Sequence, residues 1–109
     1  MKKTIALDFD GVLNNYTGWK GEKCLYTPLP GLEDFLSTLN EEYDVVIFTC
    51  RDIRKVYTWL EKYDLRKYVK VVTETKPKAM IYIDDRALKF EGNYIETLNK
   101  INKFKTWWE

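Results

Sequence analysis

The chain has 109 residues, which is enough for one domain with a buried core but too few for two, so we expect a single domain over residues 1–109. Apolar residues make up 45% and charged residues 32%, a balance typical of globular proteins rather than disordered or fibrous ones. The net charge of +1 gives no reason to expect a membrane or nucleic-acid surface as a partner, and the absence of histidine excludes Ser-His, Cys-His and His-zinc chemistry.

Cysteine content and hydropathy give a first expectation of location. Cys24 and Cys50 do not form a metal-type pair, and no apolar run has the length of a membrane helix or the form of a signal peptide. We therefore expect a cytoplasmic protein with reduced thiols and no membrane partner.

Apolar runs predict the strands. Three such runs end at polar residues, and a fourth, over 69–72, is weaker; the three stronger runs cover 5–7, 45–48 and 80–83. Unbroken, β-branched runs of this length are typical of strands that are buried on both faces of a parallel sheet.

Helical patterns lie between these runs. After Pro30, apolar residues recur at helical spacing over 32–39, and Asp52 can cap a second helix over 53–60. Asn93 and Glu96 resemble a capping box that opens a third helix, which extends to Ile101.

The alternation of strands and helices predicts an α/β fold, with a mostly parallel sheet, right-handed crossovers and helices on both faces. Ligands bind such sheets beyond the carboxyl ends of the strands. The irregular segment 14–29 is long for an idle loop, so we expect it to be functional. The link 73–78 is too short for a helical crossover, so 69–72 is either a short edge strand or has misplaced boundaries.

Acidic residues follow two of the predicted strands. Asp8 and Asp10 come after the first strand, and Asp84 and Asp85 after the last. Carboxylates at buried strand ends repel one another unless a cation joins them, and Mg²⁺ prefers oxygen ligands where a phosphate completes its shell. These four residues therefore predict a metal site, although a single aspartate at a strand end could also be a simple cap.

Further polar residues lie near the predicted strand ends. Thr49 follows the second strand and either binds phosphate or only completes the strand. Lys76 precedes the last strand, and Pro77 fixes the chain after it, but Lys78 competes for the same phosphate-binding role. Gly11 allows a sharp turn beside a bound anion.

Other neighbours are candidates for substrate contact, each with a structural alternative. Cys50 has no base to ionise it, so packing is the better interpretation. Arg51 and Arg86 can hold a phosphate or form surface ion pairs, and Trp19 and Lys20 of the long loop can touch substrate or pack on the sheet.

Taken in order, these residues resemble the motifs of the haloacid dehalogenase superfamily of phosphatases. The first motif is specific, and the others gain strength from their order after apolar runs. The matching residues are Asp8-Phe9-Asp10-Gly11-Val12-Leu13, Thr49, Lys76-Pro77 and Asp84-Asp85.

The resemblance implies a three-layer Rossmann-like fold of strand order 5-4-1-2-3. Many family members carry a large cap domain for which this chain has no room, so it resembles a capless member. The short link before the acidic pair departs from typical members, which have a helix there.

The resemblance also implies a mechanism. Asp8 would attack phosphorus and form an aspartyl phosphate, and Asp10 would act as general acid and base, with its backbone carbonyl facing the metal. Thr49 and Lys76 would neutralise the phosphoryl oxygens, and Mg²⁺ would be held by Asp8, Asp10, Asp84 and Asp85, with either member of the last pair as the direct ligand.

We therefore expect a Mg²⁺-dependent phosphomonoester hydrolase. The alternatives are a phosphotransferase with the same residues, and a receiver-like domain or binding module without fast turnover. The substrate is a small phosphorylated molecule or an exposed phosphate on a larger one, including a nucleic-acid end, and the sequence leaves the oligomeric state open. The terminal residues 103–108 either stack on bases or, as we expect, pack on the sheet edge or on a second subunit.

Overall fold

A computed structural model describes residues 2–109. Within these residues it contains four strands, three α-helices and one short 3₁₀-helix. In chain order they are β1 (Lys3–Leu7), α1 (Leu32–Glu42), β2 (Tyr43–Phe48), α2 (Ile53–Lys62), η1 (Arg66–Tyr68), β3 (Val71–Thr73), β4 (Ile81–Ile83) and α3 (Tyr94–Lys103). The predicted strands and helices are all present, with the third strand two residues later than its apolar run indicated.

The four strands form one parallel sheet in the order β3-β2-β1-β4. Leu7 pairs with Ile47 on one side and with Ile83 on the other, so the carboxyl end of β1 lies between the ends of its two neighbours. The fifth strand of the expected order 5-4-1-2-3 is not formed within residues 2–109, and β4 is therefore an edge strand.

Helices α1 and α2 cover the same face of the sheet. Both crossovers, from β1 to β2 and from β2 to β3, move in one direction, and right-handed crossovers then place both helices on one side. Inward side chains of the strands and of both helices form one buried core, which includes Ile5, Leu7, Leu36, Val45, Ile47, Val56 and Leu60.

Within residues 2–109, no helix packs on the opposite face of the sheet. The link from β3 to β4, residues 74–80, is irregular, as its length predicted. Tyr82, on this face, donates its hydroxyl to the Pro77 carbonyl at 2.5 Å, which ties the link to the sheet. The expected helix layer on the second face is therefore not formed within the described chain.

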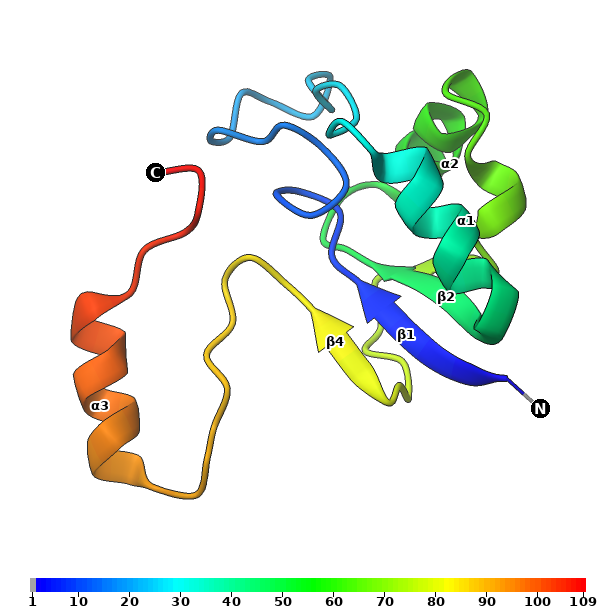
Figure 1. The fold of residues 1–109 in the computed structure, drawn as a ribbon. Helices are drawn as coiled ribbons and strands as arrows, with labels where there is room; N and C mark the ends of the chain where they lie inside the picture. Colours follow the sequence, from blue (N-terminus) through cyan, green and yellow to red (C-terminus); the bar gives the residue numbers. More distant parts are fainter. Residues whose placement is uncertain (1) are drawn as a thin grey trace.

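Helix α3 stands apart from the sheet, as the orange helix in Figure 1 shows. It begins as predicted, since the Asn93 side chain accepts a hydrogen bond from the Glu96 N–H at 3.1 Å. None of its residues is buried. After α3 the chain turns back, so that the C-terminus lies near the loop that follows β1 (Figure 1).

No helix within residues 2–109 is both long enough and apolar enough to cross a membrane.

Candidate active site and metal centre

Three carboxylates meet at the carboxyl edge of the sheet. Asp8 follows β1 and Asp84 follows β4, and the pairing of Leu7 with Ile83 aligns them. The Asp8 N–H donates to the Ile83 carbonyl at 2.9 Å, which holds the two strand ends together beyond the ladder. One carboxylate oxygen from each of Asp8, Asp84 and Asp85 lies within 4.8 Å of the others, as the strand ends predicted.

Burial and the two neighbouring carboxylates disfavour the ionised form of Asp8. Burial, together with the negative charge of Asp84 and the proximity of Asp85, raises the pKa of Asp8 from 3.8 to about 8, and the Phe9 N–H lowers it only in part. Carboxylates that would repel in this way provide the hard oxygen ligands that Mg²⁺ takes. The donor set therefore fits a magnesium ion.

A tight turn after β1 brings the cluster together. Gly11 has a φ of +81°, and a β-carbon at this position would lie 2.1 Å from an Asp85 carboxylate oxygen. The Gly11 N–H donates to the buried Asn14 side chain at 3.0 Å. Only glycine both adopts this backbone conformation easily and leaves room for Asp85.

Asp10 is not part of the carboxylate cluster. Its oxygens accept hydrogen bonds from Arg51 Nε at 2.8 Å, from Arg51 Nη2 at 3.0 Å and from Asn14 Nδ2 at 2.9 Å. The Arg51 side chain is 3% exposed, so this is a largely desolvated, bidentate ion pair. The structure thus separates the Asp10 carboxylate from the three that could hold a metal.

Thr49 and Cys50 follow β2 at the same edge of the sheet. Thr49 is buried, and its hydroxyl accepts a hydrogen bond from the Arg51 N–H at 3.0 Å. Cys50 is an exposed free thiol, which corrects the expectation that it packs in the interior. Cys24 is also free, in agreement with the expected reduced thiols.

Neither candidate lysine lies in the carboxylate cluster. Lys76 Nζ lies 4.9 Å from the centre of the Tyr82 ring, on the link across the second face of the sheet. Lys78 lies beside Thr4 at the amino end of β1, opposite the cluster. Without a helix between β3 and β4, the link runs directly back across the sheet, and both lysines are carried away from the carboxyl edge.

The C-terminal tail reaches the site, which the sequence did not predict. Trp108 Nε1 donates to Asp85 at 2.6 Å, and Trp107 Nε1 donates to the Gly11 carbonyl at 2.7 Å. The Trp108 ring also packs against Tyr16, with ring centres 5.1 Å apart, and the Arg86 guanidinium lies over it at 5.3 Å. The tail does pack, but on the loop after β1 rather than on the sheet edge.

The long loop contributes a second aromatic contact. The Trp19 ring stacks on the Arg51 guanidinium at 4.6 Å, while Lys20 lies 5.7 Å over the Tyr26 ring. Arg51 also donates to the Gly21 carbonyl at 3.3 Å. The loop therefore covers the pair that Arg51 forms with Asp10, and Trp19 is 61% exposed at its surface.

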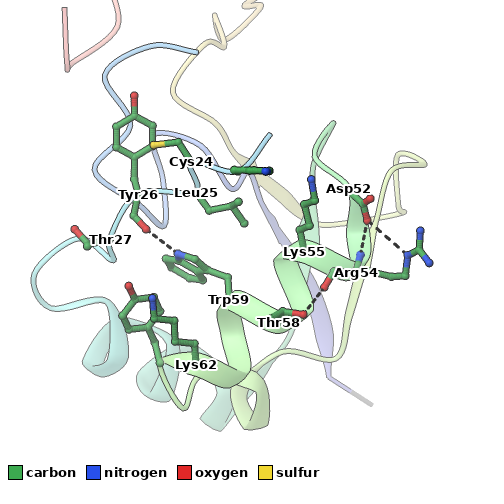
Figure 2. Close-up of a pocket in the computed structure, with 12 residues that line it drawn as sticks. Cys24, Leu25, Tyr26, Thr27, Asp52, Arg54, Lys55, Thr58, Trp59 and Lys62 are labelled. Atoms are coloured by element: carbon green, nitrogen blue, oxygen red, sulfur yellow. Dashed lines mark hydrogen bonds and ion pairs between the residues drawn. The ribbon is translucent and has the colours of Figure 1, made fainter. Parts of the chain in front are cut away.

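A cavity of about 730 Å³ lies between this loop and α2 (Figure 2). Trp59 of α2 links the helix to the loop, because its Nε1 donates a hydrogen bond to the Tyr26 carbonyl at 2.9 Å. The cavity contains none of the clustered carboxylates, and its charged lining residues are Lys23, Asp52, Arg54, Lys55 and Lys62. The excess of basic side chains makes it a favourable surface for anions.

No model of a known protein family matches the chain, and no curated protein matches it. Among solved structures, it is similar to a conserved protein from Bacteroides thetaiotaomicron, with a TM-score of 0.61 and 20% identity. The match covers 98% of this chain and 95% of that one. At this identity the likeness shows a shared α/β fold and no activity.

Proposed function

We propose that the protein is a Mg²⁺-dependent phosphomonoester hydrolase in which Asp8 is the nucleophile. The observation that carries this proposal is the convergence of Asp8, Asp84 and Asp85 within 4.8 Å at the carboxyl edge of a parallel sheet. Sheets of this kind bind ligands at that edge, and a carboxylate cluster there is suited to a cation and a phosphate.

Asp8, Asp84 and Asp85 would hold the ion. When bound, Mg²⁺ supplies positive charge that favours ionised carboxylates and offsets the negative charge of a phosphate. Trp108 donates to Asp85 and would keep that carboxylate oriented, in the way that outer hydrogen bonds fix metal ligands.

Asp8 would carry out the covalent step. Its carboxylate oxygen forms a bond to phosphorus while the bond from phosphorus to the alcohol oxygen breaks, which leaves an acyl phosphate on Asp8. The alcohol takes up a proton as it departs. Water then attacks phosphorus, loses a proton, and releases inorganic phosphate with the Asp8 carboxylate restored.

Asp10 would supply and receive these protons, with Arg51 as its controlling partner. In the structure, Arg51 donates to both carboxylate oxygens of Asp10, at 2.8 and 3.0 Å, so these oxygens are engaged by the guanidinium. To act as an acid towards the leaving alcohol, Asp10 must be released by Arg51. A substrate phosphate that draws the guanidinium away would provide that release.

Phosphate recognition would rest on arginine and threonine rather than on a lysine. Thr49 lies at the end of the strand beside Asp8, and Arg51 and Arg86 lie on the two sides of the site. The basic cavity between the loop and α2, which Asp52 helps to line, supports a substrate that carries further negative charge. We expect the combined substitutions Lys23→Glu and Lys62→Glu to raise KM for a nucleoside monophosphate and to leave KM for a small aryl phosphate unchanged.

The test is phosphate release from para-nitrophenyl phosphate. We expect turnover with Mg²⁺, loss of turnover with a chelator, and loss in Asp8→Asn, with the exposed Asp34→Asn on α1 as the matched control. Asp8→Asn with wild-type activity would contradict the proposal. If products instead show phosphoryl transfer to an added alcohol, the protein is a phosphotransferase using the same residues.

One observation favours a second candidate, a phospho-accepting domain with slow turnover. Because Arg51 engages Asp10 on both oxygens, the acid-base group is occupied in the structure. A phosphoryl donor such as acetyl phosphate would distinguish the two: an aspartyl phosphate that lasts for hours supports the receiver-like alternative, and one that decays within seconds supports the hydrolase.

A further inference from the structure

The C-terminal part of the described chain leaves an unusual amount of apolar surface uncovered. Eight large apolar side chains between residues 80 and 101 are exposed: Met80, Ile81, Tyr82, Phe90, Tyr94, Ile95, Leu98 and Ile101. From residue 2 to residue 79 there are only three, Trp19, Phe35 and Val71. Apolar residues gathered in this way mark an interaction surface.

Four of these side chains belong to α3 and are 54–79% exposed. Tyr94, Leu98 and Ile101 follow the spacing i, i+4, i+7, and therefore lie on one face of the helix. Its polar residues, none of them buried, are Glu96, Thr97, Asn99, Lys100, Asn102 and Lys103. A single helix of ten residues is marginal in water, so an amphipathic helix of this length needs a partner for its apolar face.

The helix is anchored to its own chain beyond its C-terminal end. It begins at the Asn93 cap, and beyond its end Thr106 is buried and Trp107 and Trp108 are bound at the loop after β1. α3 is thus a projecting arm rather than a free tail. The arm also explains a radius of gyration of 14.8 Å, against about 13 Å expected for a compact chain of this length.

The second apolar surface is the β4 side of the sheet. β4 is an edge strand, and Met80, Ile81 and Tyr82 are 42–46% exposed. An uncovered apolar edge strand is a recognised site of association, and natural proteins protect it with charge or with a helix. Here β4 contains no charged residue, and no helix within residues 2–109 packs on it.

We propose that a second copy of this chain covers both surfaces, with α3 of each copy packed on β4 of the other. A two-fold axis relates the two copies, so the contact between α3 of one copy and β4 of the other occurs twice in the dimer. If each of the eight side chains loses about 100 Å², the two copies together bury ~1,600 Å², the size of a standard stable interface. One chain carries both halves, so no other partner is needed to complete the interface.

The first test is the mass in solution, measured by sedimentation equilibrium. Wild type should have twice the chain mass of 13.1 kDa. Leu98→Lys places a charge in the apolar face and should give the single-chain mass, while Glu96→Lys, on the opposite face of the helix, should remain dimeric. A wild-type monomer at ~100 μM, well above the Kd that such an interface supports, would overturn the proposal, as would a dimeric Leu98→Lys.

The second test fixes which surfaces meet. In a chain with Cys24→Ser and Cys50→Ser, we expect Ile81→Cys mixed with Leu98→Cys to form an interchain disulfide under mild oxidation. Glu96→Cys mixed with Ile81→Cys should not. If Leu98→Cys alone crosslinks efficiently and the mixed pair does not, the helices pair with each other and the proposed arrangement is wrong.

Discussion

The chain changes character at about residue 74. The buried apolar residues lie between Ile5 and Val72, where β1, β2 and β3 pack under α1 and α2. From Met80 onwards the structure consists of an edge strand, a helix without buried residues and an anchored tail. Because burial of apolar surface stabilises folding, the first region holds the stability and the second depends on contacts that it makes elsewhere.

The proposed active site lies on the boundary between these two regions. Asp8 and Asp10 come from the well-packed first region, while Asp84, Asp85 and Trp108 come from the second. The first region would therefore hold the proposed nucleophile, Asp8, rigidly, and the geometry of the other proposed metal ligands depends on how firmly the C-terminal region is held. This difference can be tested region by region.

The largest effect should come from the core of the first region. Leu36→Ala removes a fully buried side chain of α1 and should lower the free energy of unfolding by about 2–5 kcal/mol. Leu98→Ala in α3 should cost less than about 0.5 kcal/mol when the protein is dilute enough to be monomeric. Denaturant unfolding at low protein concentration measures both free energies of unfolding. Equal losses in the two variants would contradict the difference in packing between the two regions.

The next effect concerns the turn that joins the regions. Gly11→Ala combines a positive φ with a β-carbon that would meet Asp85 at 2.1 Å, and should cost about 2–3 kcal/mol. Gly31→Ala is the control, because its φ is +85° but no atom lies within 4 Å of the added carbon. A smaller loss of stability in Gly11→Ala than in Gly31→Ala would show that Asp85 does not contact the added β-carbon.

The pH dependence of stability tests the carboxylate cluster. With the pKa of Asp8 raised to about 8, the folded state keeps a proton that the unfolded state loses above its ordinary pKa of 3.8. Its stabilising contribution is therefore complete below pH 3.8 and lost as pH rises through 8. With chelator present, the free energy of unfolding of wild type should fall by about 1–2 kcal/mol more than that of Asp8→Asn between pH 5 and pH 9. This figure includes a reduction for the screening of the carboxylates by water.

The melting temperature measures this difference. Added Mg²⁺ should restore the stability of wild type at pH 9 and have no such effect on Asp8→Asn. Parallel pH profiles for the two proteins would show that Asp8 is not strained by its neighbours.

The smallest effect should come from the tail. Trp108→Phe keeps the ring against Tyr16 but loses the hydrogen bond to Asp85, and should cost about 1 kcal/mol. It should also weaken Mg²⁺ binding, by up to about tenfold. Trp107→Phe, which loses a bond to the Gly11 carbonyl at an exposed position, serves as the control and should leave Mg²⁺ affinity almost unchanged.

The sequence predicted the elements well because their signals are local. The caps at Asp52 and Asn93 appear at the predicted helix starts, and the acidic pair at Asp84 falls directly after a strand, where register brings it to Asp8. The third strand begins at Val71 rather than Val69, because Val69 ends a 3₁₀-turn. Apolar residues alone do not distinguish a β-strand from a 3₁₀-turn.

Longer-range features could not be predicted in the same way. The direction of the Asp10 side chain is set by Arg51, which lies 41 residues away, and the position of Lys76 by the path of an irregular link. Trp108 reaches Asp85 only because the chain returns after α3. The capping box predicted where α3 begins, but neither a cap nor a periodic pattern says which surface covers the apolar face of the helix.

The most direct test of the proposed site is Mg²⁺ binding by titration calorimetry. We predict one site per chain in wild type, at least tenfold weaker binding in Asp84→Asn, and unchanged binding in Asp34→Asn, whose acidic residue lies in the first turn of α1, away from the cluster. Equal affinity in all three proteins, or no binding by wild type, would contradict the assignment of these carboxylates as a metal centre.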